Sequence, residues 1–376
     1  MLHYLKFTLF HCFALAAISS VFVGGMAIPI TFVVTSSIIV LGDLFLGDDL
    51  SEPNFHHENI LVFLLHCALP LTFLLLCAGL WQISPDDVFG MGAALTTLTG
   101  FDFNVAKANT SLWQKLAAIP YIGLMLSTLG TVTGHELIHR TYDKASLVIG
   151  RWLLAFSFDS NFSIEHVYNH HRWVATPSDP ASAPRGRNVY QHIVLSTIGG
   201  NISAWNIEKK RLAKRQLPIF SIANVCLRGY AMSLVLLVWS IWMAGLWGAV
   251  FFVVCGLWAK TMLEIVNYME HYGLVRDASK RVEPRHSWNT NRRISSWSMF
   301  NLSRHSHHHA HGHVPFYQLT AMPDSPTLPS GYLGCMLVTL IPPLWFKLMA
   351  PRLAWWDAHL ATEQERALIK ASAGQN

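Results

Sequence analysis

Long apolar stretches are the feature that most constrains the fold of this chain. A helix needs about 20 mostly apolar residues to cross the hydrocarbon core of a bilayer. Because the first two stretches follow each other directly, we interpret them as a helical hairpin and not as a cleaved signal peptide. The sequence therefore predicts an all-α integral membrane protein with about six transmembrane helices, in a single membrane-embedded domain over residues 1–376. The predicted spans are 7–25, 26–47, 59–82, 113–138, 222–243 and 245–268.

The composition agrees with a membrane location. Only 13% of the residues are charged and 52% are hydrophobic, whereas soluble domains carry roughly 25% charged residues. The formal net charge of +5 is modest, and we find no low-complexity basic tract of the kind that binds nucleic acid. We therefore expect membrane lipid, and not nucleic acid, around this chain.

Lysine and arginine residues predict the orientation of the spans, because positively charged loops stay on the cytoplasmic side. These residues concentrate in the His-rich segments 139–221 and 269–331, which we expect to form a cytoplasmic catalytic region. With six spans, both termini are also predicted to be cytoplasmic. The loop 48–58 gives no support, since it contains four acids and no Lys or Arg. Two shorter apolar segments are expected to be re-entrant or to lie at the membrane surface, 88–105 and 332–350.

Four clusters of histidine lie at the predicted cytoplasmic ends of the spans. The sequence contains 20 His, and histidine is the commonest metal ligand among the side chains. Residues four apart on a helix share one face, with Cβ atoms about 5–6 Å apart. The pairs His135/His139 and His166/His170 are therefore typical of two imidazoles that reach one metal. The nine patterned histidines are His135, His139, His166, His170, His171, His271, His305, His308 and His309.

The number of these histidines distinguishes between kinds of metal centre. The stretch HELIH at 135–139 matches the H-E-x-x-H pattern of zinc metalloproteases. A catalytic zinc, however, needs only three protein ligands and one open position. Nine histidines are too many for one ion and suit two. Neutral imidazole suits zinc, copper, iron and nickel, and the best chemical fit beside an apolar substrate cavity is an oxygen-activating pair of irons.

Each of the first three clusters also places an acid next to a histidine. These acids are Glu136, Glu165 and Glu270. We expect them to accept the second ring N–H of a ligand or to orient the site, because metal-bound histidines are usually fixed in this way. Three more histidines follow no ligand pattern, and their role is left open between support of the site, proton donation and contact with solvent: His307, His311 and His313.

The cysteines indicate that electrons must come from another protein. The six cysteines lie in or beside apolar stretches and include no C-x-x-C pair, so the chain contains no rubredoxin-like or iron–sulfur cluster of its own. The basic run EKKRLAKR at 208–215 is interpreted either as a docking patch for an acidic electron donor or as a positive-inside signal before the fifth span.

The four histidine motifs together resemble those of the integral-membrane alkane 1-monooxygenases and xylene monooxygenases, within the fatty-acid-desaturase-like group. The motifs of these enzymes are H-E-L-x-H-[KR], E-H-x-x-G-H-H, N-Y-x-E-H-Y-G-L and R-H-S-D-H-H-A. The resemblance covers about 113–360 and includes the stretch ATPSDPASAPRG at 175–186. In this chain the motifs read HELIHR (135–140), EHVYNHH (165–171), NYMEHYGL (267–274) and RHSHHHA (304–310).

The resemblance implies a non-haem di-iron monooxygenase of the bacterial inner membrane, with its active site on the cytoplasmic side. It implies two iron ions bound only by the nine patterned histidines, whose division between the irons is left open. It further implies hydroxylation of a terminal methyl C–H bond of a hydrophobic substrate, from medium-chain n-alkane to 1-alkanol. O₂ and electrons from a rubredoxin or an iron–sulfur ferredoxin or reductase would be consumed.

Three residues depart from the alkane-hydroxylase motifs and leave the substrate open. Arg140 replaces the usual Lys, Asn169 replaces Gly, and His307 replaces Asp. The tail 345–366 is similar to the xylene branch, whereas DPASA at 179–183 is similar to the alkane branch. A xylene or alkylbenzene methyl monooxygenase is therefore the near alternative. A lipid desaturase, an intramembrane zinc metalloprotease and a metal transporter are more remote alternatives.

Overall fold

The structure, a computed structural model, describes residues 2–373 and is helical over most of that range. Within these residues the only β-structure is two isolated bridges, Asp48 with Arg292 and Asn289 with Thr327. The first part of the chain forms α1 (Leu2–Leu5), η1 (Lys6–Thr8), α2 (Leu9–Val23), α3 (Ala27–Phe45), α4 (Glu58–Ile83), η2 (Val88–Gly90), α5 (Met91–Thr99), α6 (Phe103–Ala108), α7 (Leu112–Met125), η3 (Leu126–Val132) and α8 (Thr133–His139). The second part forms α9 (Lys144–Ala155), α10 (Phe162–Glu165), η4 (His166–His170), α11 (His171–Trp173), α12 (Val189–Lys214), α13 (Val225–His271), η5 (Pro284–His286), α14 (Arg293–Ser298), α15 (His305–Ala310), η6 (Phe316–Gln318), α16 (Tyr332–Thr339), α17 (Pro342–His359) and α18 (Glu363–Ala373).

Five helices within the described residues are long and apolar enough to cross a membrane. The prediction of an all-α membrane protein is therefore confirmed. The first four helices correspond to the first four predicted spans, while the fifth includes both the fifth and the sixth. The five helices are His3–Val23, Ala27–Phe45, Glu58–Ile83, Leu112–His139 and Val225–His271.

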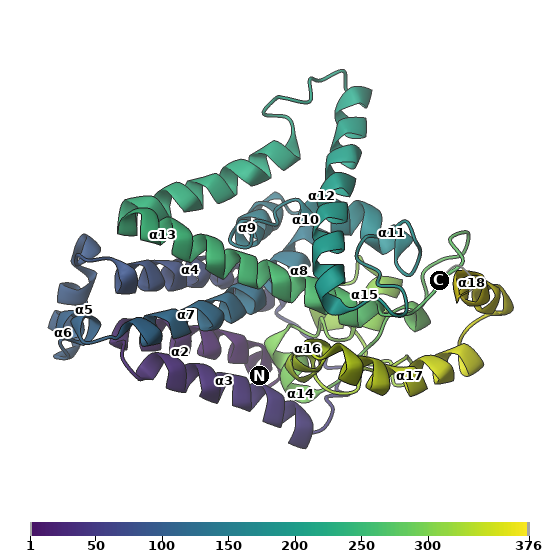
Figure 1. Ribbon diagram of the computed structural model, residues 1–376, viewed down its shortest axis with the longest axis horizontal. Helices are drawn as coiled ribbons and strands as arrows, with labels where there is room; N and C mark the ends of the chain where they lie inside the picture. The colour runs from purple at the N-terminus through teal and green to yellow at the C-terminus, as the bar shows by residue number, and fades with distance from the viewer. Residues whose placement is uncertain (1, 374–376) are drawn as a thin grey trace.

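The fifth of these helices, α13, has 47 residues and is broken in its middle. Ala244 (φ −142°, ψ 24°) and Gly245 (φ 60°, ψ −152°) are not helical, and the positive φ of Gly245 is readily adopted only by glycine. Figure 1 shows the two halves meeting at a sharp bend. The predicted spans 222–243 and 245–268 are therefore the two arms of one bent helix, joined without a loop.

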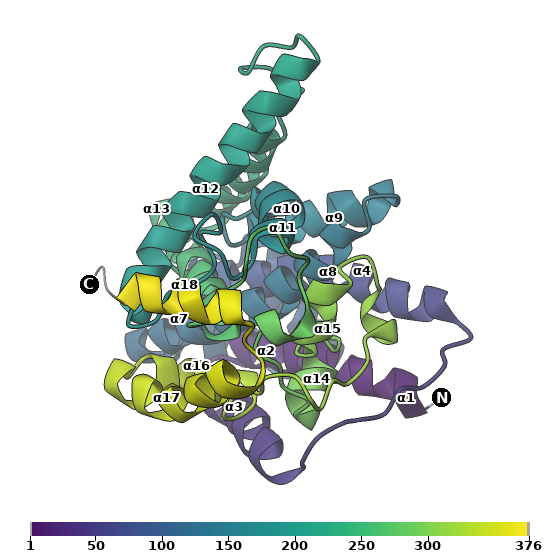
Figure 2. The same ribbon diagram turned by 90° about the vertical axis from the view of Figure 1, so that its right-hand side faces the viewer.

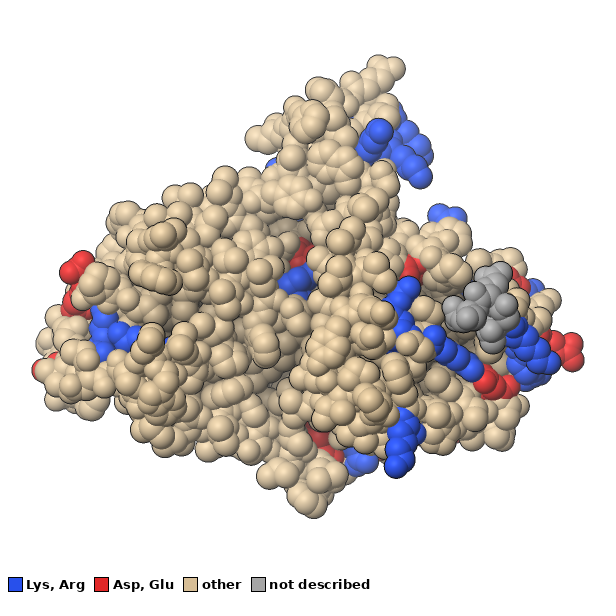
Figure 3. All heavy atoms as spheres, in the orientation of Figure 1, with Lys and Arg blue, Asp and Glu red and all other residues tan. Residues whose placement is uncertain are grey.

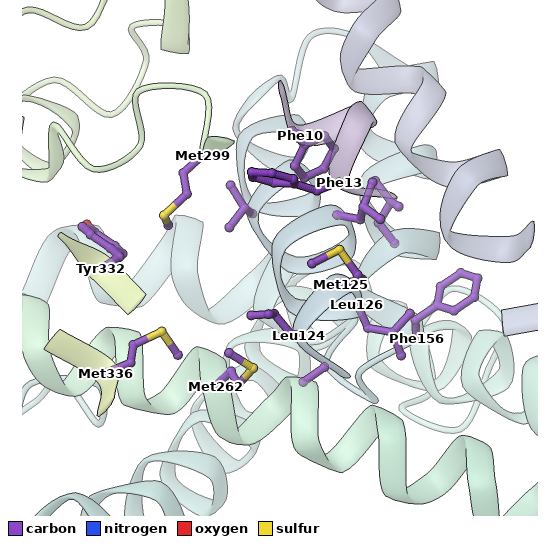
Figure 4. Packing of buried hydrophobic residues seen from close by; sticks show 14 of the residues in the cluster. Phe10, Phe13, Leu124, Met125, Leu126, Phe156, Met262, Met299, Tyr332 and Met336 are labelled. Carbon is purple, nitrogen blue, oxygen red and sulfur yellow. The ribbon is translucent and has the colours of Figure 1, made fainter. Parts of the chain in front are cut away.

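The long helices pack side by side with an apolar interior. Figure 4 shows Phe10 and Phe13 of α2 close to Leu124 and Met125 of α7, with Met262 of α13 on the far side of α7. Apolar side chains also cover the outside of the bundle, where they face lipid; Ile30, Val33, Phe63, Leu246 and Trp247 are all more than half exposed. Charged residues gather at the two ends of the molecule and are scarce between them (Figure 3).

The two ends of the bundle have different structures. The segment 88–105 contributes the short helices α5 and α6, which lie together at one end (Figure 1). The helices that carry the nine patterned histidines (α8, η4, α11, α15 and the end of α13) lie at the other end, together with α16 and α17. The segment 332–350 forms α16 and the start of α17, where Pro342 occupies the first turn, a position that tolerates proline because its N–H has no helical partner.

Candidate metal centre

Four separate segments bring all nine patterned histidines to one place. The five-histidine group consists of residues whose ring nitrogens lie within 4.8 Å of one another. The four-histidine group joins two overlapping triples that meet the same distance limit, one of three histidines and one that includes Glu270. The first group contains His135, His139, His166, His171 and His308. The second contains His170, His271, His305 and His309.

The local helix geometry decides which histidine joins which group. His166–His170 forms a π-helical turn, and π-turns inside helices are frequent at functional sites. The wider i→i+5 turn brings His171 round to the face of His166, and their Nε2 atoms are 3.0 Å apart. In an ideal α-helix a residue five positions on points about 140° away. The i,i+4 spacing favoured His166 and His170 as a pair on one metal, whereas the π-turn places them in different groups.

A second π-helical segment precedes the HELIH stretch. η3 covers Leu126–Val132 and leads directly into α8, which carries His135 and His139. Gly134 lies against α9, where an added Cβ would stand 3.1 Å from the Gly150 carbonyl oxygen. This close approach of two helices needs small residues at the contact, and it holds the imidazole of His135 with its Nε2 2.5 Å from that of His166.

The short helix α15 supplies histidines to both groups. His305 and His309 are four apart and join the four-histidine group, whereas His308 points to the five-histidine group. Arg304 fixes the start of this helix, because its buried guanidinium donates to the carbonyl oxygens of Leu319, Asp49 and Ser51 at 2.5, 2.8 and 3.0 Å. These hydrogen bonds connect the loop between α3 and α4 to the last histidine motif.

Among residues 2–373, carboxylates contact histidines of the four-histidine group and not those of the five-histidine group. His170 Nδ1 lies 2.9 Å from Asp179 Oδ2, which leaves Nε2 to face the group. Glu270 Oε2 lies 3.2 Å from His305 Nε2, and its other oxygen accepts a hydrogen bond from the Tyr332 hydroxyl at 2.6 Å. Asp179 therefore fixes the orientation of the His170 ring. Glu270 instead lies on the same His305 nitrogen that faces His271 at 3.2 Å, so it could itself hold a metal together with these two histidines.

The other two acids predicted to support the histidines bond elsewhere. Glu136 accepts a hydrogen bond from Arg140 at 3.1 Å, and Glu165 accepts one from the Asn169 amide at 2.9 Å. Asn169, one of the departures from the family motif, therefore holds an acid of the same motif. Asp179 was not among the predicted site residues. The sequence feature that could have indicated it is its position within the ATPSDPASAPRG stretch, which is shared with the resembling family.

Burial keeps most of these imidazoles neutral, which is the form that binds metal. Burial first, and then the nearness of other histidines, holds the pKa of His166, His171 and His308 well below the usual range. Burial also acts to lower the pKa of His170, but the Asp179 carboxylate outweighs it and raises that pKa. The two groups therefore differ in electrostatics as well as in composition.

Unpaired ring nitrogens fit a bound metal. Polar atoms that are buried without a hydrogen-bond partner cost about 1–3 kcal/mol each, so several of them in one place need an explanation. Both ring nitrogens of His308 and of His309, Nε2 of His139 and Nε2 of His170 are buried and unpaired. Nine nitrogen donors around two centres fit two ions that bind imidazole.

The three unassigned histidines lie outside both groups. His307 Nδ1 accepts a hydrogen bond from the Thr320 backbone N–H at 2.7 Å, and its ring contacts that of His311 with centroids 5.1 Å apart. His311 and His313 are exposed. His307 therefore has a structural partner where the family motif has Asp.

Comparisons with known proteins identify the family. Residues 111–348 match the family model described as fatty acid desaturase, which is more than half of the chain. The chain belongs to the fatty acid desaturase family. All four histidine motifs of this desaturase-family protein lie within the matched range.

Curated relatives of this desaturase-family chain are monooxygenases. It is 41% identical over 244 residues to alkane 1-monooxygenase 1 of Pseudomonas aeruginosa, a match that covers 63% of each chain. It is 36% identical over 253 residues to alkane 1-monooxygenase 2 of the same organism, covering 65% of this chain and 67% of the relative. It is 33% identical over 239 residues to the hydroxylase component of xylene/toluene monooxygenase of Pseudomonas putida, covering 63% and 64%. The chain thus spans just under two thirds of the first relative, and the family resemblance stated from the motifs is confirmed.

Proposed function

We propose that this protein is a membrane monooxygenase that hydroxylates a terminal methyl group of a hydrocarbon. The reaction combines R–CH₃, O₂, two electrons and two protons to give R–CH₂OH and water. One observation carries the proposal: nine imidazoles, seven of them buried, converge in two groups at the end of an apolar helix bundle in a chain whose curated relatives are alkane and xylene/toluene monooxygenases.

The two groups would each hold one iron ion, and they are therefore called the metal groups. The five-histidine group would use His135, His139, His166, His171 and His308, and the four-histidine group would use His170, His271, His305 and His309. When bound, the irons supply the reductive activation of O₂, which no amino-acid side chain provides. Two ions and ligation by histidine alone agree with the expectation from the sequence.

The chain itself orients the ligands and keeps water out. Asp179 fixes the ring of His170, and Tyr332 holds the Glu270 carboxylate next to His305. Figure 4 shows the thioethers of Met299 and Met336 near Tyr332. These buried thioethers form apolar packing next to Tyr332, whose hydroxyl donates to Glu270. The hydrocarbon would come from the bilayer and present its terminal methyl group to the two histidine groups.

The whole chain would act as one membrane-embedded domain, with the metal groups on the cytoplasmic side of an inner membrane. The bundle end that carries the histidines also carries the basic segments 139–221 and 269–331, and the positive-inside rule favours the cytoplasm for such segments. Electrons would come from a separate redox protein, because the six cysteines of the described chain are free and unclustered.

The decisive experiment measures products and metal together. The iron-loaded protein in detergent or nanodiscs is supplied with O₂ and a reduced rubredoxin, and with octane or a methylbenzene. We expect primary alcohol from at least one substrate and about two irons per chain. His308→Ala should abolish alcohol formation, while the exposed control His313→Ala should keep it. Absence of alcohol from both substrates, with iron bound and reduced, would contradict the proposal.

The substrate preference is the finer part of the proposal. We expect n-alkanes of medium length to be the better substrates, because the relatives with 34–41% identity include several alkane 1-monooxygenases. The xylene/toluene relative is 33% identical, so an alkylbenzene preference is the second candidate. Competition between octane and a methylbenzene in one vessel, read as the ratio of the two alcohols, decides between them.

A further inference from the structure

An open cleft of about 430 Å³ reaches from the protein surface to the metal groups. Its inner wall includes one histidine from each group, His171 and His309. The two imidazoles are stacked, with ring centroids 4.5 Å apart and planes at 22°. His171 is partly exposed whereas His309 is buried. This stacked pair therefore lies between solvent and both groups.

The outer wall of the cleft is basic. Arg172, Lys280 and Arg281 line it and are all exposed. The Arg172 guanidinium lies over the ring of Trp173 at 5.0 Å. The nearby carboxylate of Asp277 accepts hydrogen bonds from the backbone N–H and hydroxyl of Ser279. The opening thus combines positive charge with one aromatic surface, and a hydrocarbon would gain nothing from entering here.

A buried arginine joins the two segments that form the walls of this cleft. The Arg276 guanidinium donates to the carbonyl oxygens of Arg172, Val174 and Lys280 at 2.6, 3.0 and 2.5 Å. The segment after the second histidine motif and the loop after the third are therefore joined by one side chain. A binding surface fixed before its partner arrives loses less entropy on association.

The basic run 208–215, interpreted from the sequence as a possible docking patch, lies elsewhere. It forms the end of α12, on an arm that projects away from the helix bundle and from α15 (Figures 1 and 2). Part of its charge is used within the arm, because Arg211 makes two 2.6 Å hydrogen bonds to Glu208 and one of 2.7 Å to the Ala223 carbonyl. The arm offers no contact with a metal-group histidine.

We infer that the basic cleft is the docking site of the electron donor, and that electrons enter both metal groups at the stacked pair His171–His309. This inference rests on the proposed function. The partner is a small soluble redox protein whose exposed redox centre is surrounded by acidic side chains. Each turnover takes two electrons, so two one-electron donors are oxidised in succession, and two protons from solvent balance the water that forms.

The test compares the two basic patches by charge reversal. The double variant Lys280→Glu/Arg281→Glu changes the cleft, and the matched control Lys209→Glu/Lys210→Glu changes the arm; none of the four residues belongs to a metal group. With reduced rubredoxin as the probe, we expect the cleft variant to raise the KM for rubredoxin about tenfold or more with kcat within about twofold, since rim charges act mainly on encounter. Its turnover should also lose most of its dependence on ionic strength. The control should keep wild-type values.

A small-molecule measurement separates failure of this inference from failure of the proposed function. Stopped-flow reduction of the bound iron by anionic dithionite should be slower in the cleft variant, and reduction by the cationic methyl viologen radical should be faster. Neither rate needs an alcohol product. Equal rates in the cleft variant and the wild type, or a rise in the KM for rubredoxin only in the arm variant, would overturn the inference. Normal reduction without any alcohol would instead contradict the proposed function.

Discussion

The two histidine groups are built from the same kind of side chain but differ in what surrounds it. The five-histidine group consists of imidazoles alone, and the acid that follows His135 in the sequence, Glu136, bonds to Arg140. The four-histidine group has Asp179 on one imidazole and Glu270 on another. Both groups take a histidine from α15, so a single short helix divides its side chains between two electrostatic environments.

This difference would give two bound metals unequal chemistry. Carboxylates next to a ligand partly neutralise the charge of the ion and raise ligand basicity. A metal surrounded by neutral imidazoles alone keeps its full positive charge, which favours the reduced state. We therefore expect the ion of the five-histidine group to be reduced first and the ion of the four-histidine group to be held more firmly.

The largest expected effect comes from removing one ligand of each group. His308→Ala and His309→Ala alter neighbouring residues of α15 that serve different groups. Each should lower the iron content from about two to about one per chain and reduce alcohol formation to background, with the remaining iron giving a different Mössbauer spectrum in the two variants. Identical spectra would show that the groups are not distinct sites.

Substitution of a carboxylate partner should have a weaker effect, which is a loss of affinity for only one of the two irons. Asp179→Asn removes the negative charge beside the His170 ring, and loss of such a carboxylate partner typically costs about 10–100-fold in metal affinity. Competition with a chelator should show this loss for one of the two irons. Glu136→Gln serves as the comparison, because Glu136 contacts Arg140 and not a histidine. An equal loss in both variants would remove the distinction between the groups.

A smaller change is expected from Tyr332→Phe. The variant deletes only the hydroxyl that donates to Glu270 at 2.6 Å, and a hydrogen bond to a charged group contributes roughly 1.5–3 kcal/mol. We expect a shift in the spectrum of the four-histidine iron and a moderate fall in turnover, with both irons retained. A spectrum identical to that of the wild type would mean that Glu270 is fixed by other contacts.

The smallest expected effect is on the stability of the fold at low pH, through contacts between α18 and η5. Glu365 of α18 binds Arg285 and His286 of η5, and the next residue, Ser287, accepts a hydrogen bond from Ser306 of α15. Burial acts to raise the pKa of Glu365, but hydrogen bonds from His286, Thr362 and Arg285 outweigh it and lower that pKa from 4.5 to about 2.

The sign of the pH dependence follows from this lowered pKa. A depressed pKa means that Glu365 stabilises the fold fully above about pH 4.5 and loses this contribution as the pH falls toward 2. Glu365→Gln should therefore lower the Tm at pH 7, and the difference from the wild type should shrink between pH 4.5 and 2. The exposed neighbour Glu363→Gln is the control and should show no such convergence in a thermal scan.

Much of the fold and the set of converging histidines followed from the sequence. Apolar runs of about 20 residues predicted the spans, because the bilayer sets their length. Histidine clusters, most of them with helical spacing, predicted the nine histidines that the structure brings together. The sorting of these histidines between groups was beyond sequence reasoning. It depends on the π-turn at His166–His170, and such a turn changes backbone hydrogen bonding without any distinctive residue.

The supporting acids were predicted less well for a related reason. Glu136 and Glu165 are adjacent in sequence to histidines, yet neighbouring residues on a helix point about 100° apart. Glu136 therefore bonds to Arg140 and Glu165 to Asn169. Asp179 lies nine residues after His170 in a segment of turns. No periodicity relates it to its partner, so only the folded chain shows the contact.

The bend in α13 settles how many times the chain passes through the bundle. An unbroken helix from Val225 to His271 would make a single passage and leave everything after it at the opposite end from α8. The break at Ala244 and Gly245 turns that passage into two, so the number of passages is even. The second arm of α13 therefore brings His271 back to the end of the bundle that holds α8. The segment that follows places α15 and its histidines at the same end.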